Sequence, residues 1–330
     1  MKTVVTGASG FIGSSVVRRL LERGKEVRCY VEPGAKTANL DGLDVEIVVG
    51  DVNDRDAIAG ALKGADTLYH LAAIYAIWLK DPALMYRVNV EGTKTVLWAA
   101  YKANLQKVVY TSSIAAVGRR EDGQPSTEAD EFGSRDWDDG NAYIRSKWLS
   151  EVDALRFARE GLPLVAVNPG FPFGERDSAP TPTGAFIIAA LQKKLPGYMD
   201  AGFCAVDVDD VAEGHVLAAE KGRVGERYIL ANHNVTFKDF YELVARVADV
   251  PAPTRKIPIW AASGIGWAME KYAVARKQRP LATYKAAKYA ATTHYFDNSK
   301  ARRELGLPVT PLETTIEKSV RWFRAHGYAG

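Results

Sequence analysis

The sequence predicts an α/β protein with a doubly wound parallel sheet, and three observations favour this fold class. Apolar runs of strand length alternate with helical patterns, a glycine-rich turn directly follows the first run, and small or polar residues follow the later runs. We expect strands at residues 3–5, 26–31, 45–49, 67–70, 108–111 and 164–168. We expect helices around residues 16–21 and at 57–62, 88–102 and 142–159. Such alternation is typical of a parallel sheet with helices on both faces.

The second half of the chain is expected to form a smaller lobe that is interleaved with this sheet. After Pro169 the pattern breaks into shorter elements, which are separated by Pro172, Pro180, Pro182 and Pro196. We expect a returning strand near Val206, another near residues 228–230 and a last helix around 312–326. This predicts a first domain of residues 1–170, with returning segments near 204–230, and a smaller lobe of residues 171–330.

The composition is that of an ordinary globular protein. The 330 residues are 47% hydrophobic and 25% charged. A net charge of +3 without a long basic block argues against nucleic acid as a partner. Cys29 and Cys204 are far apart and lack the spacing of metal ligands. We therefore expect two reduced, buried thiols and no metal site.

Targeting features point to the cytoplasm. The first residues lead straight into a strand, so no signal peptide is expected, and no long apolar run suggests a membrane span. The apolar segment 258–269 fits a buried helix or a pocket wall better than attachment to a membrane surface. The aromatic residues of the second lobe that fit either a hydrophobic substrate pocket or a core are Trp260, Trp267, Tyr272, Tyr284 and Tyr289.

The glycine-rich turn Thr6-Gly7-Ala8-Ser9-Gly10-Phe11-Ile12-Gly13 predicts a dinucleotide-binding site. Gly7 allows a tight turn, Gly10 allows the backbone to approach a pyrophosphate, and Gly13 allows the following helix to pack on the strand. The helix start offers free N–H groups and the positive end of a dipole to the phosphates. The spacing is not the commonest fingerprint, but a strand before it and a helix after it support the prediction.

Further candidate residues stand at the carboxyl ends of the expected strands, where doubly wound sheets bind their ligands. In chain order they are Asp51, Val52, Leu71, Ala72, Ala73, Thr111, Ser112, Ser113, Asn168 and Pro169.

Tyr143 and Lys147 predict proton-transfer chemistry. They are four residues apart on an expected helix, so both project from the same face. A neighbouring ammonium is expected to favour the phenolate and lower the pKa of Tyr143. The phenol then exchanges a proton with a carbonyl/alcohol pair, while the Ser113 hydroxyl holds the substrate oxygen and Lys147 reaches the ribose of the dinucleotide.

At this point the sequence resembles a known family, the extended short-chain dehydrogenase/reductases. The motifs that carry the resemblance are residues 6–13, Asp51-Val52, His70-Leu71-Ala72-Ala73, Asn89-Val90-x-Gly92-Thr93, Tyr110-Thr111-Ser112-Ser113, Tyr143-x-x-x-Lys147, Asn168-Pro169 and residues 206–212. Within the family the chain resembles the dihydroflavonol-4-reductase-like branch, which includes proteins described as hopanoid-associated sugar epimerases. Residues 174–177, 180–184 and 225–230 carry this closer likeness. The resemblance implies a Rossmann fold with a smaller, interleaved substrate-binding lobe.

The resemblance also implies roles for single residues. Ser113, Tyr143 and Lys147 would form the catalytic triad, and Asn89 would be a structural polar residue under the site. Asp51 and Val52 would contact the adenine. The residues that would contact the rest of the cofactor are Gly7, Ser9, Gly10, Phe11, Ile12, Gly13, Leu71, Ala72, Ala73, Thr111 and Pro169. Phe171 and Phe173 follow Pro169 and fit either a substrate pocket or the core.

Glu32 favours NAD as the cofactor. It ends the second strand about 20 residues past the turn, where a carboxylate accepts the adenosine ribose hydroxyls and repels a 2′-phosphate. Reductases of the branch usually carry an arginine there. Lys36 and Arg28 are close enough in sequence to compensate, so NADP stays open.

The reaction has two candidate types, carbonyl reduction and nucleotide-sugar epimerisation or dehydration. Related epimerases usually carry Arg-Asp before the 206–212 motif, where the arginine grips a phosphate, whereas this chain carries Phe203 and Cys204. Their absence favours a reductase of an apolar aldehyde or ketone, or an alcohol dehydrogenase in reverse, with Arg176 available to an anionic substrate group. A nucleotide-sensing protein without activity is disfavoured by the presence of Tyr143 and Lys147. The resemblance further implies a homodimer through helices 88–102 and 142–159.

Overall fold

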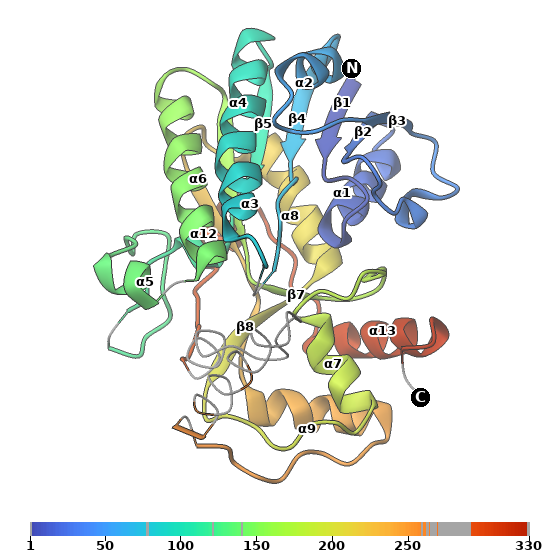
Figure 1. Cartoon of the computed structure of the whole chain (residues 1–330), viewed down its shortest axis with the longest axis vertical. Coiled ribbons are helices and arrows are strands. Elements are labelled where there is room, and N and C mark those ends of the chain that lie inside the picture. Colours follow the sequence, from blue (N-terminus) through green and yellow to red (C-terminus); the bar gives the residue numbers. More distant parts are fainter. Residues whose placement is uncertain are drawn as a thin grey trace.

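The computed structural model describes residues 2–76, 79–120, 122–139, 141–258, 260–261, 264, 269 and 292–328. The larger part of the structure is a parallel sheet covered by helices, and the smaller part lies beyond the carboxyl ends of its strands (Figure 1). Of the expected aromatic residues of the second lobe, Trp267, Tyr272, Tyr284 and Tyr289 lie outside the described residues, whereas Trp260 is 78% exposed.

Among the described residues, seven strands form one parallel sheet in the order β3-β2-β1-β4-β5-β6-β9. They are β1 (Lys2–Thr6), β2 (Glu26–Val31), β3 (Glu46–Val49), β4 (Ala65–His70), β5 (Lys107–Thr111), β6 (Leu164–Pro169) and β9 (Arg227–Leu230). The strand order reverses between β1 and β4, so the carboxyl ends of these two strands flank the natural crevice of a doubly wound sheet. The predicted fold class is confirmed.

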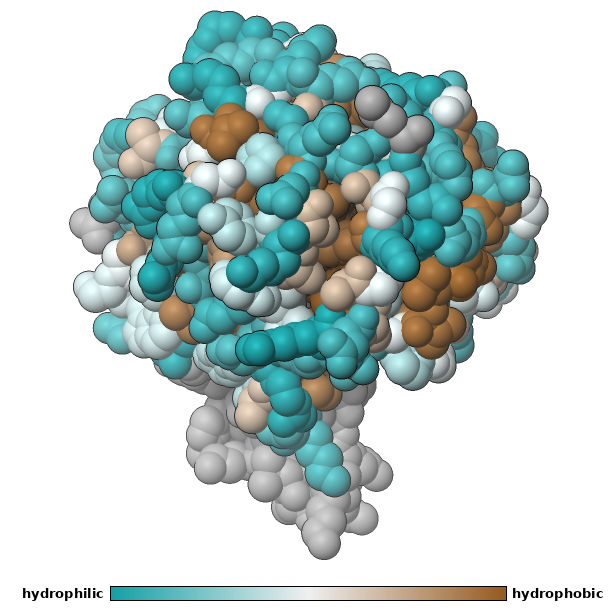
Figure 2. Space-filling model, turned by 90° about the horizontal axis from the view of Figure 1, so that it is seen from above, coloured by the Kyte–Doolittle hydropathy of each residue, from teal (hydrophilic) through white to brown (hydrophobic). Residues whose placement is uncertain are grey.

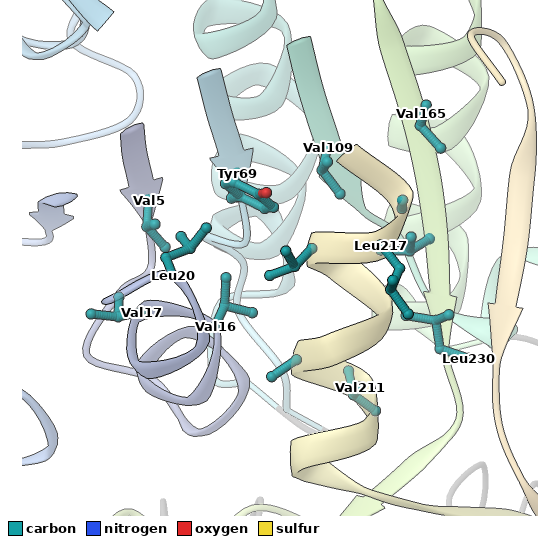
Figure 3. Packing of buried hydrophobic residues seen from close by; sticks show 14 of the residues in the cluster. Val5, Val16, Val17, Leu20, Tyr69, Val109, Val165, Val211, Leu217 and Leu230 are labelled. Carbon is teal, nitrogen blue, oxygen red and sulfur yellow. The ribbon is translucent and has the colours of Figure 1, made fainter. Parts of the chain in front are cut away.

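Apolar side chains that alternate along each strand build a core on both faces of the sheet. Val5 packs on one face with α1 (Phe11–Glu22) and α8 (Val208–Lys221), as Figure 3 shows. Val4 points to the other face. The helices that cover this second face are α2 (Arg55–Leu62), α4 (Thr93–Lys102) and α6 (Ala142–Arg159).

A three-stranded sheet forms the centre of the smaller part, in the order β10-β8-β7. Its strands are β7 (Phe171–Phe173), β8 (Gly202–Asp207) and β10 (His233–Thr236), and the helices packed around it are α7 (Gly184–Leu191), α9 (Phe237–Ala248) and α13 (Leu312–Ala325). The strand expected near Val206 therefore does not return to the large sheet, as predicted, because β8 pairs with β7 and β10 instead. The predicted division at residue 170 stays a prediction.

The remaining described elements connect these layers. They are the 3₁₀ turns Ala38–Leu40 and Ile114–Ala116, α3 (Pro82–Tyr86), the π-helical turn Arg87–Gly92, α5 (Ser134–Asp139) and α12 (Ser299–Glu304). The helix expected at 88–102 is thus a π-helical turn that continues into α4.

Two expectations about the surface and the thiols meet the structure as follows. Cys29 and Cys204 are free and buried, which confirms that prediction. Within the described part of the chain, no helix is long and apolar enough to cross a membrane. The face seen in Figure 2 is mainly hydrophilic, with hydrophobic residues in separate patches. Trp98 and Tyr101 on α4 and Val152 on α6 are exposed, and the homodimer expected through these helices stays a prediction.

Candidate active site

The turn after β1 has no room for side chains at its glycines. Gly7 has a φ of +66°, and a Cβ there would lie 2.8 Å from the backbone nitrogen of Ala72. A Cβ on Gly13 would lie 2.1 Å from the carbonyl oxygen of Gly7, and one on Gly10 would lie 3.2 Å from the same atom. The turn is therefore a tight cradle in which backbone, and not side chains, meets a ligand.

The helix start that follows this cradle is not capped by a side chain. The helices α2, α6 and α8 begin at Asp54, Asn141 and Asp207, each of which accepts a hydrogen bond from an N–H group of the first turn. In contrast, α1 begins at Gly10 with no such hydrogen bond and no acidic residue in its first turn. Its N–H groups and dipole fit the pyrophosphate of a dinucleotide.

A buried polar pair holds the loop after β4 against this cradle. The Thr6 hydroxyl oxygen accepts hydrogen bonds from the N–H groups of Leu71 and Ala72, both at 3.2 Å, and lies 2.7 Å from His70 Nδ1. Burial, with a smaller effect of the Lys147 charge, lowers the pKa of His70 to about 3, so the ring is neutral. Leu71, Ala72 and Ala73 are thereby fixed beside Gly7, where the central part of a dinucleotide would lie.

The residues expected at the adenosine end also stand at the strand ends. Glu32 directly follows β2 and is exposed, as is Asp51 beyond β3, and Val52 is buried beside it. Arg28 does not reach this end, because its guanidinium pairs with Glu46 at 2.9 Å and donates to backbone carbonyls near α2. Of the two cations considered as compensation for Glu32, only Lys36 stays exposed near the loop.

Ser113, Tyr143 and Lys147 come together at the end of β5. Ser113 is 8% exposed and is hydrogen-bonded through its side chain to Tyr143. Lys147 is 5% exposed, and its Nζ donates to the carbonyl oxygen of Thr111 at 2.8 Å. The Thr111 hydroxyl is anchored in turn by His215 at 2.9 Å. The phenol, the hydroxyl and the ammonium thus share one site at the carboxyl end of the sheet.

The expected lowering of the pKa of Tyr143 is not what the structure gives. Burial of the phenol raises its pKa to about 12, and the hydrogen bond with Ser113 only partly opposes this effect. Burial lowers the pKa of Lys147 to about 8, against the opposing charge of Glu151. Because Lys147 is directed to the carbonyl of Thr111, its ammonium does not contribute to the shift at Tyr143. The phenol is therefore protonated at neutral pH and suited to donate a proton.

Asn89 fixes the loop that faces Tyr143. Its side chain accepts from the N–H of Ile74 at 2.7 Å and donates to the carbonyl of Ile74 at 3.1 Å, and it also donates to Ser146 on α6. This agrees with the structural role expected for Asn89. The next residue, Tyr75, is 40% exposed, and its ring centroid lies 5.0 Å from that of Tyr143.

Sequence reasoning missed Tyr75. Its position just beyond the fourth strand was the available signal, because the same argument singled out Leu71, Ala72 and Ala73.

The phenylalanines after Pro169 divide between the two parts of the molecule. Pro169 is buried at the end of β6. Phe173 is 2% exposed and packs on Phe203 and Phe240, so it belongs to the core and does not line a pocket as expected. Phe171 is half-buried, and its ring lies 5.0 Å from that of Phe203.

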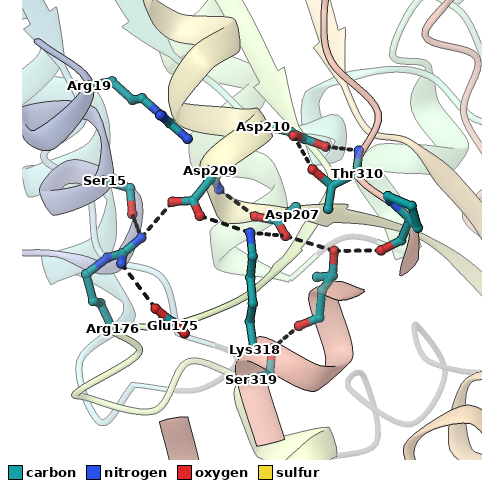
Figure 4. A network of polar contacts seen from close by, with 12 residues as sticks. Ser15, Arg19, Glu175, Arg176, Asp207, Asp209, Asp210, Thr310, Lys318 and Ser319 are labelled. Atoms are coloured by element: carbon teal, nitrogen blue, oxygen red, sulfur yellow. Dashed lines mark hydrogen bonds and ion pairs between the residues drawn. The ribbon is translucent and has the colours of Figure 1, made fainter. Parts of the chain in front are cut away.

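Arg176 lies in an ionic network and not among the triad residues (Figure 4). Its guanidinium donates to Asp209 at 2.6 Å and to the Ser15 hydroxyl of α1 at 3.4 Å. Lys318 of α13 bridges Asp207 and Asp209 in the same network, at 3.1 Å each. The expected contact of Arg176 with an anionic substrate has no support in this arrangement, because two carboxylates, Asp209 and Glu175, already accompany its charge.

Comparison with known proteins agrees with this site. Residues 3–231 match the model of the "NAD dependent epimerase/dehydratase family". A "Putative dihydroflavonol 4-reductase" from Synechocystis sp. is 38% identical over 328 residues, which cover 98% of this chain and 95% of that protein. "Sterol demethylase protein B" from Methylococcus capsulatus is 34% identical over 331 residues, with 99% of each chain covered. The crystal structure of gox2253 superimposes with a TM-score of 0.89 at 38% identity and covers 99% of both chains.

The matched residues include the glycine turn, the Ser113 strand end and the Tyr143–Lys147 pair. The chain therefore belongs to the NAD dependent epimerase/dehydratase family, as a dihydroflavonol-4-reductase-like member of the extended short-chain dehydrogenase/reductases, and is an NAD(P)-dependent enzyme acting on a CH–OH/C=O pair.

Proposed function

We propose that the chain reduces the carbonyl group of a largely apolar aldehyde or ketone with NADH, and that Ser113, Tyr143 and Lys147 carry the proton chemistry. The observation that favours a reductase over a nucleotide-sugar epimerase is the burial of Phe203 and Cys204, which are 0% and 1% exposed. A position that would present an arginine to a diphosphate is instead occupied by an aromatic cluster.

The names of the two curated relatives support an apolar substrate, since one mentions a dihydroflavonol and the other a sterol. Tyr75 extends the apolar surface next to the phenol of Tyr143. An apolar ring system packed there would exclude water from the carbonyl group and strengthen its hydrogen bonds.

In this proposal the substrate oxygen accepts hydrogen bonds from Ser113 and Tyr143. The nicotinamide, when bound, supplies the hydride to the carbonyl carbon. Tyr143 then donates its proton to the oxygen, which its raised pKa permits at neutral pH. Lys147 binds the ribose hydroxyls, and its charge limits the cost of the phenolate that remains. The cofactor contacts are those expected from the sequence, with Asp51 and Val52 at the adenine and Pro169 at the nicotinamide.

The direct test is to mix the purified chain with NADH and a series of apolar aldehydes and ketones, and to follow the loss of NADH absorbance. We expect turnover with at least one carbonyl class and none with nucleotide sugars. Interconversion of a nucleotide sugar without any consumption of NADH would instead identify an epimerase, whose cycle regenerates its cofactor. Analysis of nucleotide released on denaturation separates the two further, because an epimerase retains oxidised NAD.

Glu32 is expected to set the preference for NADH. Replacing Glu32 with Ala removes an exposed carboxylate at the place of the adenosine ribose, so the ratio of kcat/KM for NADPH to that for NADH should rise about tenfold or more. Glu26 is the matched control, because it is an exposed carboxylate at the other end of β2 and pairs with Lys2. Glu26→Ala should leave the ratio unchanged. An unchanged ratio in Glu32→Ala would contradict the assignment of this residue.

A further inference from the structure

A carboxylate lies buried directly beneath the catalytic residues. Glu151 stands one helical turn after Lys147 on α6, and its side chain is 3% exposed. A buried carboxylate is costly unless it is paired and hydrogen-bonded. Its partners therefore indicate what it holds in place.

Glu151 is connected to Ser113 through one amide. Its Oε2 accepts a hydrogen bond from Asn168 Nδ2 at 2.5 Å, and the same amide nitrogen donates to the carbonyl oxygen of Ser113 at 2.9 Å. Asn168 is completely buried on β6, and its Oδ1 has no hydrogen-bond partner. The opposite orientation of the amide would give up both donated bonds. The carboxylate thus selects the orientation that fixes the backbone of Ser113.

A second partner balances the charge. Arg227, at the start of β9, donates from Nη1 to Glu151 Oε1 at 2.7 Å. Its other donors reach the backbone carbonyls of Glu128 and Asp130 at 2.8–3.0 Å. Arg227 therefore holds the carboxylate from the side opposite Asn168 and joins it to the loop between β5 and α6.

The same carboxylate faces the Lys147 ammonium. Lys147 is surrounded by Tyr110 of β5, with Nζ 5.6 Å from the ring centroid, by neutral His70 of β4 and by Tyr143 and Glu151 of its own helix. Of these groups, Glu151 is the one that carries a negative charge at neutral pH. It opposes the effect of burial, which lowers the pKa of Lys147.

We propose that Glu151 is a positioning residue of the active site, which orients Asn168 to fix Ser113 and keeps Lys147 charged, with Arg227 as its counter-cation. This inference rests on the proposed function of the triad. It assigns a role to three buried residues, Glu151, Asn168 and Arg227, that lie outside the triad itself.

The first test is Glu151→Gln, with the pH dependence of kcat for reduction as its readout. Glutamine has a similar shape but one acceptor oxygen for two donors, and it has no charge to favour the ammonium. We expect the alkaline limb of the profile, where Lys147 loses its proton, to move about one pH unit or more to lower pH. Glu151→Asp keeps the charge and should retain the wild-type position of the limb at a reduced kcat.

A merely structural role would lower the amount of active enzyme equally at every pH and leave the limb in place. The matched control is Glu128→Gln. Glu128 is half-buried near Arg227, but its side chain accepts from the N–H of Ile229 and not from Asn168. We expect a wild-type profile for this variant. A folded Glu151→Gln enzyme whose limb stays at the wild-type pH overturns the proposal.

Asn168→Ala tests the second link, and it decides the matter if Glu151→Gln does not fold. It leaves the charge of Glu151 in place and releases the backbone of Ser113. We expect kcat to fall about tenfold with the limb and the NADH dissociation constant unchanged, since one positioning hydrogen bond is lost. An unchanged kcat overturns the proposal. Failure of the proposed function is recognised separately, because Tyr143→Phe would then retain activity whatever Glu151 does.

Discussion

Replacing Tyr143 with Phe is expected to lower kcat for carbonyl reduction by about 10²- to 10⁴-fold, the usual contribution of a positioned general acid. The variant loses only the hydroxyl that is hydrogen-bonded to Ser113. The ring remains, so its packing against Tyr75 and the binding of NADH should be preserved. Steady-state rates together with NADH titration by fluorescence would measure both quantities. The defect should appear in kcat and kcat/KM alike, because the proton is transferred only in the transition state.

Tyr101→Phe provides the matched control for this substitution. Tyr101 lies on α4, is 39% exposed and stacks on Trp98, away from the triad. It should keep the wild-type rate. Activity retained in Tyr143→Phe would show that another group donates the proton, and the assignment of the triad would be wrong.

The pH dependence follows from the protonation state of the same phenol. Its raised pKa keeps it protonated through the neutral range, so reduction starts from the correct state. Oxidation of the alcohol needs the deprotonated form, and its rate should therefore rise as the pH increases. The expectation from the sequence had the opposite sign for this pKa, because it considered the charge of Lys147 and not the burial of the phenol.

The large sheet could be predicted from the sequence because its signals are local. Each strand of that sheet is a short run of apolar residues, and the expected runs 26–31, 108–111 and 164–168 lie within one residue of β2, β5 and β6 at each end. The triad could be predicted for a related reason. Ser113 follows a strand, and Tyr143 and Lys147 share one helical face, so two short-range patterns give their positions.

Features that depend on pairing between distant segments could not be predicted. The strand near Val206 has the same apolar character as the strands of the large sheet, and only its pairing with β7 and β10 places it in the other sheet. Arg176 bonds to Asp209, 33 residues away, and Glu151 pairs with Arg227, 76 residues away. No periodicity in the sequence records such contacts. Phe173 illustrates the same limit, since an aromatic residue beyond a strand end suits a pocket as well as a core.

Replacing Gly13 with Ala is expected to be the most damaging small change at the cofactor site. The added Cβ would lie 2.1 Å from the Gly7 carbonyl oxygen and 2.9 Å from the Gly7 carbonyl carbon, so the turn itself must move. Overpacking of this kind costs about 1–3 kcal/mol, which corresponds to roughly a 5- to 150-fold loss of affinity if it is met by displacing the turn. Titration of the variant with NADH would measure the loss directly.

Gly60→Ala separates this effect from a general consequence of adding a methyl group. Gly60 lies in α2, and a Cβ there would have no atom within 4 Å. Alanine at this helical position should preserve NADH affinity and increase stability by about 0.5–1 kcal/mol. If Gly13→Ala instead bound NADH with wild-type affinity while remaining folded, the pyrophosphate would not depend on the close packing of Gly7 against α1. The dinucleotide would then have to be placed elsewhere on the carboxyl edge of the sheet.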